Sequence, residues 1–220
     1  MIDFILTPGE VGAYPAVTIA PSETIPYASI LQQVAIAGRT RSTARPEAAI
    51  VIAALLAAEK ASKQQRLQFS FRSLSGEWRL CFVTGTQKRR QGGITLGKGF
   101  YLPRIGRAAI GFTPEGETSI GQIRNQVQVG QLALRLAGPA RYLDKKNILA
   151  FDFTQIQFCF GQVTLGSLSF RGGSDKTTAF ATTSITQLPF FTFFWITDDL
   201  IAARGRGGGL AIWIRETNPN

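Results

Sequence analysis

Side chains able to carry out catalysis are scarce in this chain of 220 residues. The sequence contains no histidine, which excludes a Ser-His-Asp triad, a Cys-His pair and any imidazole metal site. Its two cysteines, Cys81 and Cys159, each lie in an apolar run, where a reduced thiol behaves as a small hydrophobic side chain. Two thiols are too few for a four-thiolate metal centre. We therefore expect no catalytic residue and no metal site, and we predict that the protein is not an enzyme.

Two acidic residues and a glycine-rich run could still do chemistry. Asp198 and Asp199 could form a catalytic pair, but neighbouring residues of a strand point to opposite faces, which favours a turn or capping role. The run from Arg204 to Gly209 could cradle an anion, but the lysine-serine ending of a phosphate-binding loop is absent. Such a run is also typical of a hairpin turn that needs positive φ. The turn is the interpretation that we favour.

The charge balance indicates an anionic surface as a partner. Lys and Arg number 24 and Asp and Glu 14, so the formal net charge is +10. Basic residues gather between positions 85 and 107, where Lys88, Arg89 and Arg90 are consecutive. Anionic membranes attract such clusters at about 1 kcal/mol per basic residue. Nucleic acid would attract them too, but the Arg-Gly-Gly runs are isolated and precede strand-like sequence, so we predict no nucleic-acid partner.

The chain divides into an arm (1–45), a main domain (46–216) and a short tail (217–220). The arm is punctuated by prolines and has a short helical pattern near residues 29–37; a disordered leader and a docking arm both remain open. The domain begins with a helix over residues 46–66, rich in strong helix formers. Its apolar run, Ala48 to Ala58, has eleven residues, fewer than the ~20 that span a membrane. The first residues lack the basic start of a secretory signal.

Beyond residue 67 the apolar pattern changes from a helical period to alternation, which is typical of strands. Short β-branched and aromatic segments are separated by clusters of Gly, Pro, Asn or Asp. This spacing predicts an antiparallel meander, and closure into a barrel would remove edges that so apolar a sheet could not expose. We therefore predict a mainly β fold: an antiparallel lipocalin-like β-barrel with one N-terminal α-helix packed on it.

The interior of such a barrel has room for one apolar ligand. The segment Gly76-Glu77-Trp78 would place a tryptophan at the closed end, and Arg204 and Arg215 could cover its indole by cation–π stacking. The predicted ligand-binding residues, all expected to face the interior, are Trp78, Leu80, Phe82, Phe151, Phe153, Leu210, Ile212 and Ile214.

Residues 188–196 hold five aromatic side chains in the six positions 190–195. Alternation would bury only one face of such a strand, so the other face could meet lipid headgroups, pigments or another protein. Alternatively, a helix or the arm covers the outside and the strand is buried on both faces. The predicted membrane or partner surface comprises Phe190, Phe191, Phe193, Phe194 and Trp195 together with Lys88, Arg89 and Arg90.

The two ends of the domain together resemble a known family. The segment from Thr197 to Glu216 is similar to the C-terminal signature of the plastid lipid-associated proteins, or fibrillins, and Leu-Ser-Gly-Glu-Trp-Arg-Leu at 74–80 is similar to their first strand. The signature turn matches at Asp198, Asp199, Arg204 and Gly205. Two positions depart from it, because Arg206 replaces an acid and Ala211 replaces a large aromatic. The resemblance covers residues 46–216.

The resemblance implies a lipocalin-like barrel at the thylakoids or lipid bodies of an oxygenic phototroph, such as a cyanobacterium. We expect a non-enzymatic protein that binds an isoprenoid lipid, quinone, carotenoid or chlorophyll at the thylakoid membrane, peripherally on its cytoplasmic or stromal side. The alternative is a structural or assembly factor that docks on a photosystem or antenna complex through the arm and the aromatic strand. Tetrapyrrole handling of the bilin-lyase type also suits a small barrel, but the strands present no convincing inward acid.

Overall fold

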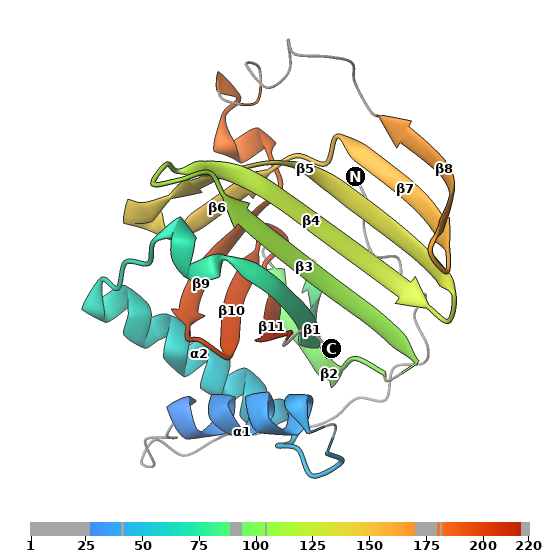
Figure 1. The fold of residues 1–220 in the computed structure, drawn as a ribbon. Coiled ribbons are helices and arrows are strands. Elements are labelled where there is room, and N and C mark those ends of the chain that lie inside the picture. Colours follow the sequence, from blue (N-terminus) through green and yellow to red (C-terminus); the bar gives the residue numbers. More distant parts are fainter. Residues whose placement is uncertain are drawn as a thin grey trace, which may run out of the picture.

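The structure is a computed structural model that describes residues 27–40, 42–88, 94–103, 105–169, 180 and 182–216, with the side chains of Gln87, Lys88 and Ile94 left aside. Its main body is a closed barrel of eight antiparallel strands (Figure 1). The barrel strands are β1 (Gly76–Lys88), β3 (Gly106–Pro114), β4 (Ile120–Val129), β5 (Leu132–Leu143), β6 (Ile148–Phe151), β9 (Phe190–Ile196), β10 (Leu200–Gly205) and β11 (Leu210–Arg215).

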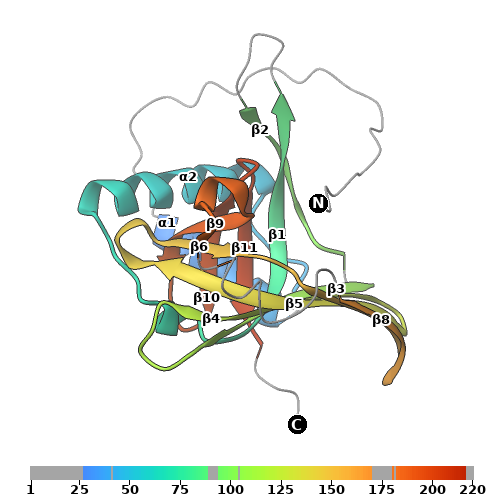
Figure 2. The same ribbon diagram turned by 90° about the horizontal axis from the view of Figure 1, so that it is seen from above.

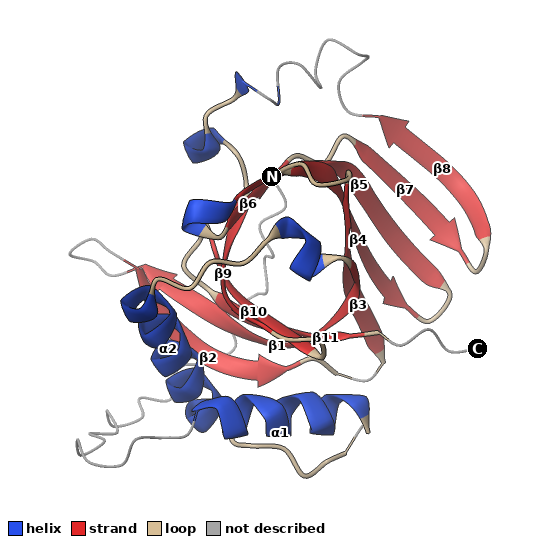
Figure 3. Cartoon of the chain, turned by 60° about the vertical axis from the view of Figure 1, so that its left-hand side comes forward, coloured by secondary structure: helices blue, strands red, loops and turns tan. Residues whose placement is uncertain are grey.

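The barrel depends on pairing between strands that are far apart in the sequence, such as the first strand β1 and the last strand β11. Around the ring the strands run β4-β3-β1-β11-β10-β9-β6-β5, and pairing of β5 with β4 completes the circle (Figure 3). First and last strands therefore lie side by side, with Trp78 opposite Arg215. The predicted mainly β fold, an antiparallel barrel with an N-terminal helix packed on it, is confirmed.

Three further strands lie outside the ring. β2 (Ile94–Tyr101) pairs with the second half of β1. β7 (Gln155–Phe160) pairs with the first half of β5, and β8 (Val163–Ser169) pairs with β7. Together with residues 125–129 of β4 and 132–137 of β5, these two strands form a sheet that we call the wing. The wing extends on the side of the barrel away from the helices (Figure 2).

Two helices cover the outer wall formed by β1, β9, β10 and β11. Helix α2 (Ala48–Gln65) corresponds to the predicted helix over residues 46–66, and it ends where Arg66 takes a left-handed φ of 52°. Helix α1 (Tyr27–Arg39) contains the helical pattern expected near residues 29–37. It packs so tightly on β11 that a Cβ on Gly38 would lie 2.7 Å from Ile214 Cδ1. Residues 27–39 of the predicted arm are thus docked on the barrel, while residues 1–26 lie outside the described residues.

Apolar side chains from the two helices and from the barrel strands form the core between the helices and the wall. Leu31 and Val34 of α1 and Val51, Leu55 and Ala58 of α2 are buried against the outward side chains of the barrel strands. A separate core fills the barrel itself. The barrel wall is therefore apolar on both faces in this region.

Candidate functional site

One end of the barrel is closed by a short 3₁₀ helix, η1 (Phe71–Leu74), which lies across the opening (Figure 3). Trp78 is completely buried beneath it, and its Nε1 donates a hydrogen bond of 2.7 Å to the carbonyl oxygen of Leu74. The guanidinium of Arg215 lies 4.0 Å from the centre of the indole ring. Trp78 therefore lies at the closed end, and Arg215 stacks on it as expected.

The middle of the barrel is filled by aromatic side chains from four strands. Phe193 packs edge-on against Phe112 with ring centres 6.0 Å apart. Phe191 lies 5.4 Å from Trp213 and 5.2 Å from Phe151. Such pairs contribute about 0.5–1.5 kcal/mol each beyond the burial of their area. The sequence did not single out Phe112 or Trp213, although both belong to this interior.

The opposite end of the barrel, which we call the mouth, carries partly exposed apolar residues. Leu80, Phe153, Phe191 and Ala211 are half-buried and pack on the buried interior side chains. The strand register places this mouth away from η1, because β11 pairs with β1 at Arg215 beside the closed end and reaches Ala211 further along. Leu80, Phe151 and Phe153 lie inside the barrel as predicted. The four half-buried side chains are the partly exposed residues at this end of the interior.

Four residues predicted to face the interior face the helices instead. Phe82, Leu210, Ile212 and Ile214 belong to the core between the wall and α1 and α2. In β1 the register with β11 shifts between Leu80 and Phe82, so a bulge sends both Cys81 and Phe82 outward. In β11 the inward residues are the alternate ones, Ala211 and Trp213. Because both faces of these strands are apolar, alternation alone could not tell which face points inward.

The aromatic strand β9 is not the exposed contact surface that was predicted. Phe193 is 1% exposed inside the barrel, and Phe194 is 2% exposed under the helices. A register shift against β10 turns both Phe194 and Trp195 outward, where Trp195 packs edge-on against Tyr27 at 5.6 Å. Phe190 and Phe191 are half-buried, the first of them against Phe180 and Leu188. The strand is covered on both faces, as the alternative interpretation held.

Of the three basic residues of the predicted surface, the structure describes only the backbone of Lys88. Lys88 is the last residue of β1. The side chain of Lys88, and all of Arg89 and Arg90, lie outside the described residues.

The signature turn residues have structural partners. Asp198 and Asp199 lie in the turn between β9 and β10, where Asp199 forms an ion pair with Arg39 and the Asp198 carbonyl accepts a hydrogen bond from Arg215 Nε. The run after Arg204 is a hairpin turn between β10 and β11. Gly205 N–H donates to the Gly209 carbonyl at 2.9 Å. The predicted turn role therefore agrees with the geometry.

Arg204 does not cover Trp78 but ties α2 to the barrel. Its Nε donates to Glu59 Oε1 at 2.9 Å and its Nη2 to Glu59 Oε2 at 2.5 Å, a bidentate pair. Glu59 is buried and also accepts a hydrogen bond from Lys63 at 2.9 Å. Burial acts to raise the pKa of Glu59, but the hydrogen bonds from Arg204 and Lys63 outweigh it and hold that pKa below its ordinary value. The carboxylate therefore stays charged and fixes the helix on β10.

The wing presents an exposed apolar face that sequence analysis missed. β4 pairs with β5, and β5 with β7, without a register shift, so alternation along these ladders stays in phase. Ile123 and Ala140 face the barrel interior, so the residues that follow at alternate positions toward the wing lie on the same side of the sheet. Six of them are between 48% and 63% exposed: Phe158, Phe160, Leu168, Val129, Leu132 and Val163.

The opposite face of the wing is polar. Gln126, Arg135, Gln157 and Ser167 form one row across its four strands. Arg135 Nε donates to Gln126 Oε1 at 3.2 Å within this row. The wing is therefore amphipathic, and its apolar side lies on the same face of the sheet as the barrel interior, with Asn125 as a polar position between Ile123 and Val127.

Two kinds of feature are absent from the part of the chain that the structure describes. Its helices include none that is both long and apolar enough to cross a membrane. Its Cys, Asp and Glu side chains form no group of three or more that could hold a metal ion.

The fold defines the class: a closed, antiparallel, mainly β barrel with helices packed on its outer wall. No protein-family model matches the chain, and no curated protein matches it. Among solved structures, it is similar to a redesigned β-barrel at a TM-score of 0.29 and 8% sequence identity, over 68% of this chain and 96% of that chain. A likeness this distant carries no functional argument.

Proposed function

We propose that the protein binds an apolar, lipid-like molecule at the barrel mouth and on the apolar face of the wing, without transforming it. One observation carries the proposal: the exposed apolar face of the wing lies on the same side of the sheet as the barrel interior. Soluble proteins rarely expose contiguous apolar patches of this kind unless the patch binds something. A ligand with a long hydrocarbon part would cover this face while its end lies in the mouth.

The residue at position 211 supports a ligand in the mouth. Ala211 faces inward opposite Ala203 of β10, at the position where the fibrillin-like signature has a large aromatic residue. A small side chain here leaves the mouth wider than an aromatic ring would. The apolar lining suits the chemistry of an isoprenoid quinone, a carotenoid or a chlorophyll, the ligands that the family resemblance also implies.

The net charge supports a membrane as the source of the ligand. At +10 the chain is attracted to anionic lipid, and a protein held at a leaflet meets apolar molecules at high local concentration. We propose a peripheral position at the thylakoid membrane of an oxygenic phototroph. Flotation with anionic liposomes should decrease steeply as salt rises from ~0.1 M to ~1 M, because the screening length falls from ~10 Å to ~3 Å. Flotation that does not depend on salt would remove this part of the proposal.

The binding test uses decylplastoquinone, a soluble quinone with a short tail, and follows quenching of tryptophan fluorescence, since Trp213 lies beneath the mouth. The wild-type chain should bind it saturably. Ala211→Phe should narrow the mouth and weaken binding about tenfold. Phe160→Asp should weaken it by a similar factor, because burying a phenylalanine contributes about 1.5–3 kcal/mol.

The matched control is Gln157→Asp, which puts the same charge on the polar face of the same strand. Its affinity should stay within about twofold of wild type. The proposal is wrong if the wild-type chain binds neither decylplastoquinone nor a carotenoid supplied in detergent. If, in addition, one photosystem or antenna complex co-purifies stoichiometrically, the docking alternative replaces it, with the wing as the contact in place of β9.

A further inference from the structure

A small pocket opens on the outer face of the barrel wall, on the other side of β1 from Leu80. It lies between the end of α1, residues 42–45 before α2, and strands β1 and β2. Its volume is about 50 Å³. A single water needs roughly 10–15 Å³ of such volume, so the pocket has room for about three to five waters. That is the size of a small oxyanion.

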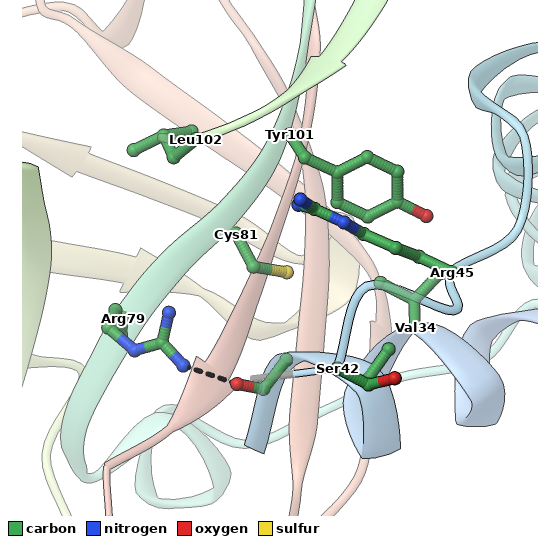
Figure 4. Close-up of a pocket in the computed structure, with 9 residues that line it drawn as sticks. Val34, Ser42, Arg45, Arg79, Cys81, Tyr101 and Leu102 are labelled. Carbon is green, nitrogen blue, oxygen red and sulfur yellow. Dashed lines mark hydrogen bonds between the residues drawn. The ribbon is translucent and has the colours of Figure 1, made fainter. Parts of the chain in front are cut away.

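Two guanidinium groups from different elements line this pocket (Figure 4). Arg79 comes from β1, and its Nη2 donates to the Gly38 carbonyl at 2.7 Å. Arg45 comes from the segment before α2 and lies over the ring of Tyr101 at 4.7 Å. The described residues that line the pocket include no carboxylate.

The positive charge of the pocket is poorly compensated. Within the described part of the chain, Arg45 makes neither a hydrogen bond nor an ion pair. The Arg79 ion pair, from Nε to Glu216, is long at 3.9 Å, and Glu216 is already held by Arg107 Nε at 2.9 Å. Arg79 Nη1 is therefore left with no hydrogen bond to the described residues.

The two ionisable groups between the arginines do not supply the missing negative charge. Cys81 is buried at the base of the pocket, and burial raises its pKa to about 12 although both guanidiniums act to lower it. Burial also raises the pKa of Tyr101 to about 12. At neutral pH both side chains are uncharged, so two positive charges face the same small space.

We propose that this pocket binds a phosphate group. A carboxylate has two oxygens and is satisfied by one guanidinium, whereas a phosphate can accept hydrogen bonds from two guanidiniums on different sides. Toward the described residues, all N–H groups of Arg45 and the Nη1 of Arg79 are without hydrogen bonds. The Ser42 hydroxyl also lines the pocket and is an additional donor. The phosphate group comes from inorganic phosphate or from the monoester headgroup of a lipid.

The test measures binding by titration calorimetry with the full chain in phosphate-free buffer at about 0.15 M KCl, where long-range attraction is screened. One arm uses inorganic phosphate, a second a short-chain phosphatidic acid below its micelle concentration, and a third the matching phosphatidylcholine. Saturable 1:1 binding of phosphate or phosphatidic acid is expected, without binding of phosphatidylcholine. Tighter binding of phosphatidic acid identifies the headgroup as the source, and equal binding identifies free phosphate.

Variants separate the pocket from the general positive charge. Arg45→Gln should weaken binding about tenfold or more, because charge-assisted hydrogen bonds are lost. Lys60→Gln removes one positive charge from an exposed position on α2 outside the pocket and should change affinity less than twofold. Equal losses in both variants, or no saturable binding in any arm, would overturn the proposal. With the described residues, Arg45 makes a single aromatic contact, so its variant should fold normally, which circular dichroism checks.

Discussion

Replacing Trp78 tests whether the closed end holds the barrel together. Trp78→Ala removes a completely buried indole, which costs about 3–5 kcal/mol through lost burial and the cavity left behind. It also leaves the Leu74 carbonyl without its 2.7 Å donor, at about 1–3 kcal/mol, and removes the ring beneath Arg215. We therefore expect a loss of about 5 kcal/mol or more, a large part of the 5–15 kcal/mol available to a typical domain.

The assay is equilibrium unfolding in urea followed by far-UV circular dichroism. Trp78→Phe keeps an aromatic ring but loses the N–H donor, so it should cost less than Trp78→Ala and remain measurable if the alanine variant does not fold. Trp195→Ala is the control, because that half-buried indole lies outside the barrel against Tyr27 and should cost less than either Trp78 change. A loss below about 1 kcal/mol for Trp78→Ala would refute the idea that this residue anchors the closed end.

Four further tests probe other parts of the fold. Arg204→Met should destabilise the protein by about 3–5 kcal/mol, since it leaves the buried Glu59 carboxylate unpaired, and changing both residues to apolar ones should recover most of the loss. The pKa of Glu59 in the folded protein lies below its ordinary value of 4.5, so the charged carboxylate contributes fully to the free energy of unfolding above that pH and less as the pH falls. The difference in stability between wild type and Glu59→Gln should therefore shrink toward pH 3. In Gly138→Ala the added Cβ would collide with the backbone carbonyl oxygen of Asp152, so this variant should not fold normally. Gly166→Ala, with open space around the added Cβ, should be tolerated. The urea midpoints of the two variants test this difference. With the other cysteine changed to serine, Cys81 should resist maleimide at pH 8 until denaturant is added, because its pKa is about 12, and rapid labelling of the folded chain would contradict its burial.

The sequence was sufficient for the fold class because alternation and turn residues are local signals. It placed α2 and the closed end at Trp78 correctly, and it anticipated the helical pattern that became α1. Strands β2 and β3 were not predicted, since their glycine-rich and basic stretches resemble loops.

Which face of a strand points inward was harder to predict, for a physical reason. Alternation reveals an interior only when the other face meets water, and the helices remove that contrast from β1, β9, β10 and β11. Two bulges then invert the phase within single strands, as the outward position of Phe82 shows. The apolar face of the wing escaped notice for the converse reason, because Phe158 and Phe160 look like ordinary core residues until the pairing of β7 is known.

The unbroken ladder between β4 and β5 gives the molecule a gradient of stiffness. The same hairpin forms part of the ring and the root of the wing, so its amides should exchange with solvent as slowly as those of the ring. β7 has two described neighbours and β8 has one, and exchange should quicken outward in that order. A long, flexible ligand would thus contact the more mobile strands of the wing first and the rigid barrel mouth last.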